Sequence, residues 1–352
     1  MRRLIVRGAL AAAAVAGVVG AGCAPEPGSG SSPTVPISSS TTTTESPTTT
    51  TTTPVSLQWQ GIATATAPSA RNGVAMAYDA ARGQSVLWGG WNHRTRTRSG
   101  DTWVWDGATW VRRAASGIEP AAFASMAYDS QRERVVLFGG WANTTNRNDT
   151  WEWNGTQWTF RTVAQSPPAR YSASMAYDAA RQRVVLFGGT TSNSNFADTW
   201  EWDGQAWTNR PTAVAPEARA YHAMAYDAAR QRVVLFGGDD IHGGAGRIFN
   251  DTWEWDGTSW TQVASVHSPP PSDGHSMTYD SDRGRVVMYN GGNGEVWEWD
   301  GIDWTQRTPS GSPPSRSWFG MTYDVARERT VVFGGAQGNS GYLNDTWELT
   351  TG

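Results

Sequence analysis

Cysteine is almost absent from this chain, which has one, Cys23, among 352 residues. No disulfide can therefore form within the chain, and no cluster of thiolates can hold a metal ion. The five histidines are dispersed, and none belongs to an HExxH motif or to a pair with the spacing of metal ligands. We therefore predict no metal site and no cofactor.

Basic runs and catalytic signatures are missing as well. The chain has 28 Lys and Arg against 32 Asp and Glu, which gives a formal net charge of −4. Because contacts between basic side chains and phosphates dominate affinity for nucleic acids, this composition argues against a nucleic-acid partner. The sequence has no phosphate-binding loop and no nucleophile elbow, so it identifies no catalytic residue.

The N-terminus is apolar, but its apolar run is too short to cross a membrane. Residues 1–22 contain three arginines and then a run of mainly Ala, Val and Gly over 9–20, where a spanning helix needs about 20 apolar residues. The run ends in Val19-Gly-Ala-Gly-Cys23, which resembles the lipobox of bacterial lipoproteins. The resemblance implies a signal peptide over 1–22 and a lipid on Cys23, so we expect an exported protein anchored to the outer side of the cell membrane. An ordinary secretory signal with a chance cysteine, or a twin-arginine signal, is left open.

Residues 23–55 consist of the predicted lipid-bearing cysteine and a segment of mainly Ser, Thr, Pro and Gly. Such a segment has too little apolar surface to offset its chain entropy, so we expect a disordered tether. Drawn out at about 3.3 Å per residue, it would reach on the order of 100 Å. Glycosylation of its threonines is left open.

The rest of the chain contains six copies of one sequence repeat. Its third copy reads SMAYDAARQRVVLFGG over residues 174–189, followed by DTWEWDGQAW over 198–207. The tyrosine of the block recurs at Tyr78, Tyr128, Tyr177, Tyr226, Tyr279 and Tyr323, with a period of about 50 residues. Each copy reads as four short strands, with Gly-Gly after the second and, in five copies, Asp-Gly or Asn-Gly after the third.

The Gly-Gly pair, the spaced tryptophans and the four-strand layout resemble the kelch repeats of the galactose oxidase and kelch-like proteins, over roughly residues 56–349. The resemblance implies an all-β, six-bladed propeller over 56–352. The sixth copy ends without a fourth strand, while Trp59 precedes Tyr78 by the spacing of a fourth-strand Trp, so we predict that residues 57–60 complete the last blade. We expect a monomer. The copper centre of one such family uses a cysteine-linked tyrosine, which this chain cannot build beyond Cys23.

Repetition also separates scaffold from candidate site. Seventeen of the 21 tryptophans, and the Tyr-Asp-x-x-Arg unit of every copy, recur at fixed positions, and we assign them to the scaffold. The connections between second and third strands differ between copies, and they lie with the fourth-to-first connections at one end of the propeller, where binding residues would concentrate. Residues that break the pattern at this end are the predicted ligand-binding set: Arg71, Arg170, Arg219, Arg316, Trp91, Trp141, Trp318, Tyr171, Tyr221 and His222.

Two readings of these residues are open. The four arginines would form a partial ring suited to a carboxylate or sulfate, or else pair with aspartates of neighbouring blades. The tryptophans would hold a ligand or pack their own loops. We predict an extracytoplasmic, membrane-anchored binding protein for an envelope protein or a glycan, and not an enzyme. The alternative is a carbohydrate-active enzyme with two carboxylates facing each other across the channel.

Overall fold

The computed structural model describes residues 55–113, 117–143, 145–240, 242, 246–338 and 341–352. The predicted signal peptide (1–22) and all but the last residue of the predicted tether (23–55) lie outside these residues. Within them, no helix has the length and apolarity that a bilayer crossing would need.

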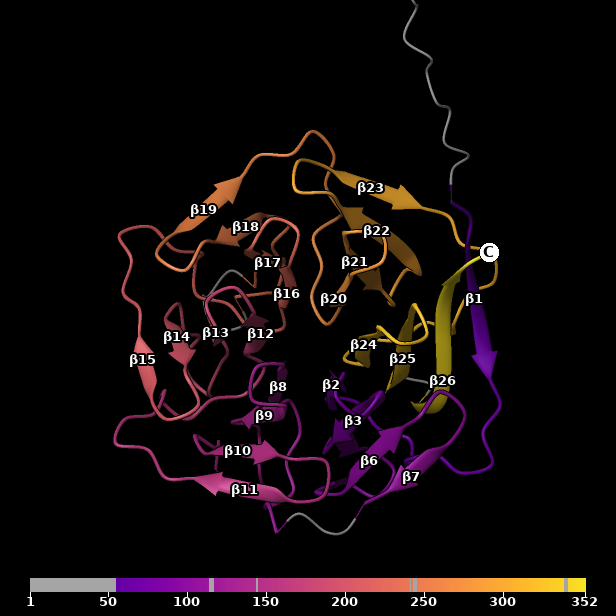
Figure 1. Cartoon of the computed structure of the whole chain (residues 1–352), viewed down its shortest axis with the longest axis horizontal. Helices are drawn as coiled ribbons and strands as arrows, with labels where there is room; N and C mark the ends of the chain where they lie inside the picture. Colours follow the sequence, from indigo (N-terminus) through magenta and orange to yellow (C-terminus); the bar gives the residue numbers. More distant parts are fainter. Residues whose placement is uncertain (1–54, 114–116, 144, 241, 243–245, 339–340) are drawn as a thin grey trace, which may run out of the picture. The chain divides into compact units, whose positions relative to one another are not determined.

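The described residues form six four-stranded antiparallel sheets, set as blades around a central channel (Figure 1). From the channel outwards, blade 1 has β2 (Ala75–Asp79), β3 (Gln84–Trp88), β6 (Thr102–Trp105) and β7 (Trp110–Arg112); blade 2 has β8 (Ser125–Asp129), β9 (Arg134–Phe138), β10 (Thr150–Trp153) and β11 (Trp158–Arg161); blade 3 has β12 (Ser174–Asp178), β13 (Arg183–Phe187), β14 (Thr199–Trp202) and β15 (Trp207–Asn209). Blade 4 has β16 (Ala223–Asp227), β17 (Arg232–Phe236), β18 (Thr252–Trp255) and β19 (Trp260–Val263); blade 5 has β20 (Ser276–Asp280), β21 (Arg285–Asn290), β22 (Glu295–Trp299) and β23 (Trp304–Arg307); blade 6 has β24 (Gly320–Asp324), β25 (Arg329–Ala336), β26 (Tyr342–Thr351) and β1 (Leu57–Ile62).

The predicted closure of the ring is confirmed. β1 pairs antiparallel with β26, with Trp59 opposite Leu349 and Leu57 opposite Thr351. The first and last strands of the described chain therefore lie in one sheet, which covers the sheet edge that an open ring would expose.

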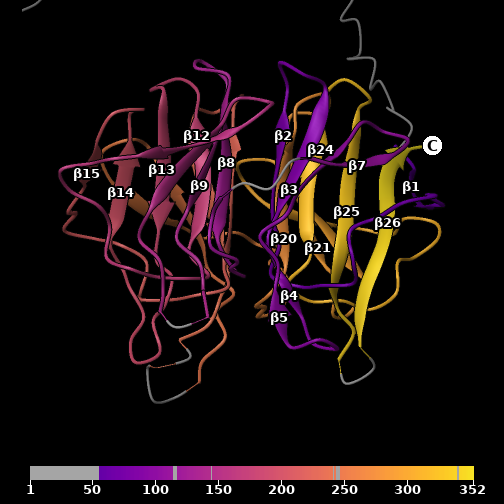
Figure 2. The same cartoon turned by 90° about the horizontal axis from the view of Figure 1, so that it is seen from below.

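The two ends of the ring differ in what they carry. The turn face bears the short turns between first and second strands and between third and fourth strands. The loop face bears the connections from each blade to the next and those between second and third strands, which span 89–101, 139–149, 188–198, 237–251, 291–294 and 337–341. In Figure 2 the loop face lies at the bottom, where the small hairpin of β4 (Trp91–Asn92) and β5 (Thr97–Arg98) projects.

The core lies between the blades and not in the channel. Each of six apolar clusters joins side chains of two neighbouring blades, such as Val86 and Trp88 of blade 1 with Leu137 and Trp153 of blade 2. The methionine of every inner strand belongs to one of these clusters, and flexible thioethers suit such irregular gaps.

The repeated tryptophans are scaffold, as predicted, and they also bind one blade to the next. In five blades the fourth-strand Trp donates its indole N–H to the threonine at the start of the repeated third-strand motif of the preceding blade, as Trp207 does to Thr150 at 2.8 Å and Trp110 to Thr346 at 2.8 Å. Burying such a ring stabilises the fold by roughly 4–6 kcal/mol as an upper bound.

The Tyr-Asp-x-x-Arg unit is a clasp on the turn face. In every copy the buried aspartate forms an ion pair with the arginine three residues later, as Asp178 does with Arg181 at 2.7 Å. The clasp reaches the next blade too, because the amide of Ala180 donates to the Tyr226 hydroxyl at 3.1 Å and Arg181 donates to the carbonyl of Gln231 at 3.2 Å. The turn face is thus occupied by contacts that hold the ring together.

Candidate functional site

A belt of six backbone hydrogen bonds surrounds the channel at the loop face. The amide of each belt residue donates to the carbonyl of the belt residue in the preceding blade at 2.7–3.1 Å, and the last bond closes the circle. The belt residues are Gly73, Phe123, Ser172, Tyr221, Gly274 and Trp318. Because each blade supplies one link, the belt fixes the position of every side chain that it carries.

Small and aromatic residues alternate around the belt. Phe123, Tyr221 and Trp318 come from blades 2, 4 and 6, and their ring centroids lie 5.7–6.1 Å apart. The glycines between them make this possible, since a Cβ on Gly73 would lie 2.9 Å from the Phe123 ring and one on Gly274 would lie 2.7 Å from the Trp318 indole nitrogen.

All six belt residues have positive φ, between 53° and 65°. Glycine adopts this left-handed conformation freely, whereas a residue with a bulky side chain is strained there by roughly 1–2 kcal/mol. Phe123, Tyr221 and Trp318 therefore stand where the backbone favours glycine. Strain of this kind is typically retained at functional sites.

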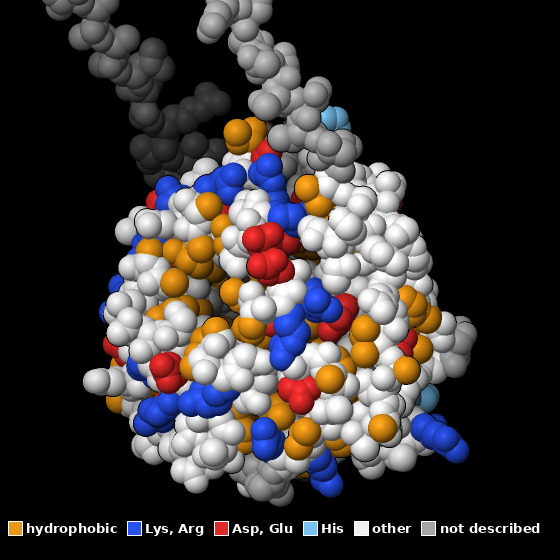
Figure 3. All heavy atoms as spheres, turned by 45° about the vertical axis from the view of Figure 1, so that its right-hand side comes forward, with side chains coloured by type: hydrophobic (Ala, Val, Ile, Leu, Met, Phe, Trp, Pro, Cys, Tyr) orange, Lys and Arg blue, Asp and Glu red, His pale blue; other side chains and the backbone are white. Residues whose placement is uncertain are grey.

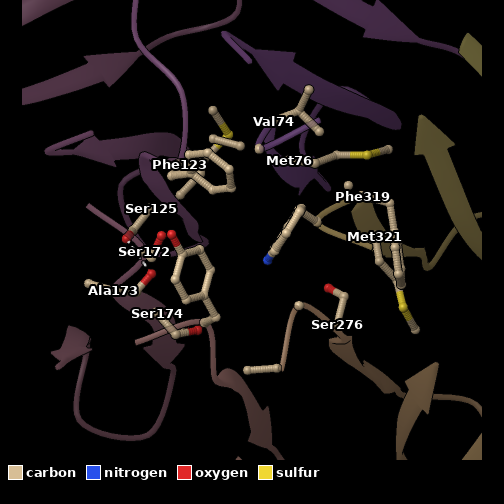
Figure 4. A pocket seen from close by; sticks show the side chains of 18 of the residues that line it. Val74, Met76, Phe123, Ser125, Ser172, Ala173, Ser174, Ser276, Phe319 and Met321 are labelled. Atoms are coloured by element: carbon tan, nitrogen blue, oxygen red, sulfur yellow. Dashed lines mark hydrogen bonds between the residues drawn. The ribbon is translucent and has the colours of Figure 1, made fainter. Parts of the chain in front are cut away.

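A cavity of about 170 Å³ lies in the channel at the belt. It is lined by the belt residues, by the residues that directly follow them, among them His222 and His275, and by the first residues of the inner strands. Phe123, Ser172 and Ser276 surround it in Figure 4. The side chains of Met76 and Met321 turn away from it, towards the clusters between blades.

The four predicted binding arginines are buried and already paired. Arg71, Arg170, Arg219 and Arg316 are at most 2% exposed. Each donates to the carbonyl of the first glycine after the second strand and to the aspartate that opens the third strand, as Arg170 does to Gly188 at 2.9 Å and to Asp198 at 2.5 and 2.8 Å. The aspartate belongs to the same blade, not to a neighbouring one as our alternative had it.

The pairing with arginine lowers the pKa of three of the four aspartates. Burial by itself would raise the pKa of Asp198, but the hydrogen bonds and the charge of Arg170 outweigh it and hold that pKa below its ordinary value. The same holds for Asp101 and Asp251. In blade 2, where Ala121 replaces the arginine, Arg147 of the connecting loop pairs with Asp149 instead. The guanidinium groups are thus engaged in the scaffold, and we leave them out of the site.

Trp91 and Trp141 come together on the loop face, with their ring centroids 5.7 Å apart. The guanidinium of Arg98 lies 3.7 Å from the ring centre of Trp141 and 5.0 Å from that of Trp91. Tyr171 continues the row, 6.3 Å from Trp141 and 6.4 Å from Phe123 of the belt. We call Trp91, Trp141 and Tyr171 the aromatic arc; Trp141 is 37% exposed and the other two are partly exposed.

His222 lies inside the wall between blades 3 and 4 and not on the surface. Its ring packs edge-on against Phe187 of blade 3 with centroids 5.6 Å apart, and His275 packs in the same way against Phe236 of blade 4. Burial lowers the pKa of His222 to about 3, with a further contribution from Arg219, and burial lowers the pKa of His275 to about 4. Phe319 occupies the equivalent position in blade 6, against Tyr289. Both histidines are therefore neutral packing residues at neutral pH.

Two carboxylates stand at the belt on the side of blades 4 and 5. Asp239 pairs through its backbone with Ala220, next to Tyr221, and Asp273 precedes Gly274 of the belt. Burial raises the pKa of the Tyr221 hydroxyl, and Tyr171, Asp239 and Asp273 raise it further. Burial also raises the pKa of Asp273 itself. No ion pair of Asp273 occurs within the part of the chain that the structure describes.

The structure brings Trp91, Trp141, Tyr171, Tyr221 and Trp318 into one region and leaves the four arginines and His222 in the walls around it. Three members of this region had no signal in the repeats. Phe123 and Asp273 lie at positions whose residue type changes between copies, and Arg98 lies in a connecting loop whose sequence also differs between copies. Alignment of the belt position across copies would have exposed the alternation of small and aromatic residues.

Among the described residues that line the channel, no carboxylate faces another. The cavity at the belt and a second cavity at the turn-face end, lined by the six repeated tyrosines and the methionines, have no Asp or Glu among the described residues that line them. No group of three or more His, Cys, Asp or Glu suited to a metal ion occurs in the described ranges either. On the side of the molecule seen in Figure 3, basic and acidic side chains are interspersed and form no single charged patch.

Comparison with known proteins agrees with the repeats. A family model described as the KLHDC2/KLHL20/DRC7 Kelch-repeats domain matches residues 153–300. A solved structure named "Structure of YjhT" is similar, with a TM-score of 0.60 and 14% identity, over 80% of this chain and 95% of that chain. A search of curated proteins finds no match. The findings support kelch-type repeats in a six-bladed propeller, a fold that suggests a scaffold for protein interactions.

Proposed function

We propose that this protein is an extracytoplasmic, membrane-anchored binding protein whose loop face holds an envelope protein or a glycan. The observation that carries the proposal is the exposed aromatic arc on the face whose connections differ between blades. The opposite face uses the same residues in all copies for contacts within the ring, so it offers little that is specific for a ligand.

The position of the first described strand is consistent with a loop face that is free to bind. β1 runs antiparallel to β26, so its first residue, Leu57, lies at the turn face opposite Thr351. A tether that precedes residue 55 would therefore join the propeller at the turn face. With a lipid on Cys23, the tether would then be attached at the face opposite the loop face, which leaves the loop face accessible to other envelope components.

The described channel cavities give no support to the enzyme alternative. A glycosidase of the usual kind needs two carboxyl groups about 5–10 Å apart around a bound sugar. The described linings of both channel cavities contain none.

Affinity capture from an envelope extract, run beside a glycan panel, tests the proposal. Trp141→Ala should abolish retention of the partner while the melting temperature stays nearly unchanged. Phe160→Ala is the matched control, because Phe160 is an exposed aromatic residue, 51% accessible, on the outer strand β11. Equal retention by both variants would contradict a site on the loop face.

Membrane attachment is tested separately. Cys23→Ser should release the protein from washed membranes into the soluble fraction, because a lipid at this residue is the proposed anchor. A variant that stays membrane-bound would exclude the lipid anchor and would leave the binding proposal untouched.

A further inference from the structure

We propose that the channel mouth on the loop face binds an arginine side chain of a protein partner. The channel mouth is the group formed by Phe123, Tyr221, Trp318, Asp239 and Asp273. This inference rests on the proposed binding function and specifies the chemistry of its partner.

The three rings of the channel mouth have the geometry of a cage. Phe123 is nearly perpendicular to Tyr221 and to Trp318, with interplanar angles of 89° and 85°. A sugar stacks on an open, flat aromatic face, whereas rings that meet at right angles enclose a small group between faces and edges. Cages of this kind attract cations, because the negative face of each ring is directed at the charge.

The backbone strain described above favours a functional reason for these rings. Glycine stands at the belt in blades 1 and 5 and would serve in every blade, yet blades 2, 4 and 6 place aromatic residues there at positive φ. The alternation gives each ring the space that a side chain on its neighbour would fill. The belt thus holds a strained but rigid set of rings, which is what recognition of a small charged group requires.

Asp273 gives the channel mouth a negative charge. It directly precedes Gly274 of the belt, and Asp239 pairs through its backbone with Ala220, next to Tyr221, so both aspartates are carried by backbone next to the belt. Asp273 is half-buried and, in the described part of the chain, has no arginine beside it, unlike the aspartates that open the third strands. A cationic ligand would compensate this charge, and an acidic ligand would be repelled.

The molecule shows which cation such a setting accepts. The guanidinium of Arg170 lies 3.8 Å from the ring centre of Phe196 and pairs with Asp198, and that of Arg219 lies 3.8 Å from the ring centre of Phe249 and pairs with Asp251. A ring and a carboxylate thus hold a guanidinium in two blades of this protein. The chain has no lysine, so every such contact is made by arginine. The channel mouth offers rings and a carboxylate without the guanidinium, and an arginine of a partner would supply it.

Two small probes test the inference directly. N-acetylarginine amide should shift the indole N–H resonance of Trp318 in an NMR titration, with the resonance assigned through Trp318→Phe. N-acetylcitrulline amide has the same shape with a neutral urea group, and it should bind at least about tenfold more weakly because it lacks the charge. Equal binding of the two probes, or binding of neither, would overturn the inference.

Removal of the charge from the protein is the second arm. Asp273→Asn should weaken binding of the arginine probe at least about tenfold. Because burial raises the pKa of Asp273, the ionised carboxylate opposes folding, so this variant should be as stable as the parent at neutral pH or slightly more so. Asp282→Asn, an exposed aspartate on the turn face, is the control and should bind as the parent does. Unchanged binding by Asp273→Asn would contradict the inference.

The cage itself is tested by Phe123→Leu, which keeps an apolar side chain but removes one ring. It should weaken binding of the arginine probe several-fold, and unchanged affinity would contradict a cage. Failure of the arginine probes together with loss of the captured partner in Trp141→Ala would overturn this inference alone. Retention of the partner by Trp141→Ala would count against the proposed function, whatever the probes do.

Discussion

The turn face and the loop face are made by the same six repeats, yet they have opposite characters. On the turn face, every copy pairs the same Asp with the same Arg, and four of the six repeated tyrosines accept a hydrogen bond from an amide of the neighbouring blade. On the loop face, the backbone belt is equally regular, but its side chains change from glycine to tryptophan. Regular backbone with irregular side chains is the arrangement expected of a rigid platform that presents a site.

The difference predicts which substitutions unfold the protein and which leave it folded. Substitutions on both faces test it.

The largest loss of stability is expected on the turn face. Asp178→Ala removes a buried carboxylate that accepts hydrogen bonds from the amide and the guanidinium of Arg181, so the free energy of unfolding should fall by about 4 kcal/mol. Urea unfolding measures this change. Asp282→Ala, at an exposed aspartate of blade 5 on the same face, should stay within about 0.5 kcal/mol of the parent. A similar loss in both would show that the clasp is not specific.

Arg219→Ala tests whether Arg219 belongs to the scaffold or to the binding site on the loop face. The side chain is fully buried and its partner Asp251 is mostly buried, so the free energy of unfolding should fall by about 3 kcal/mol. If the variant instead kept its stability and lost the partner, Arg219 would belong to the binding site, as the sequence alone had predicted.

Acid should lower the free energy of unfolding, because the two buried histidines are neutral in the folded protein. The folded pKa of His222 is about 3, below the ordinary value near 6.5, so the unfolded chain takes up a proton first and stability falls as the pH drops below about 6.5. By about pH 4.5 the loss of stability that His222 alone causes should reach about 2–3 kcal/mol. His222→Phe, which copies Phe319 of blade 6, should remove this part of the loss in urea titrations at several pH values. An unchanged pH profile would mean that His222 is solvated.

The smallest effect is expected from a residue with positive φ on the turn face. Gln182 is exposed on the turn face with a φ of 57°, and the equivalent residues Gly83 and Gly284 are glycines. Gln182→Gly should therefore raise the free energy of unfolding by about 0.5–1 kcal/mol, measured by urea or heat. A loss of stability would indicate that the hydrogen bond from Gln182 to Gln131 outweighs the strain.

The repeats predicted much of the fold because each copy has the same strand and turn motifs in the same order. The period of about 50 residues predicted six blades, and the position of Trp59 predicted that β1 completes blade 6. The partners of the four arginines were less accessible to sequence reasoning, because an arginine and its aspartate are about 30 residues apart and only the register of the blade shows that they meet.

The belt lay beyond sequence reasoning for a different reason. Its bonds are made by backbone atoms, and its six positions share a conformation but no residue type. A filter that looks for repeated residues passes over such a position. Trp318 and Tyr221 were found because they are large or adjacent to arginines, whereas Phe123 and Asp273 were missed.

Hydrogen exchange of the protein with and without the partner obtained by affinity capture tests whether the loop face is the binding face. We predict new protection of backbone amides at the loop face, over residues 91–100, 141–148 and 239–250, and none in the turns at 80–83 or 179–182. Protection confined to those turns would contradict a binding site on the loop face.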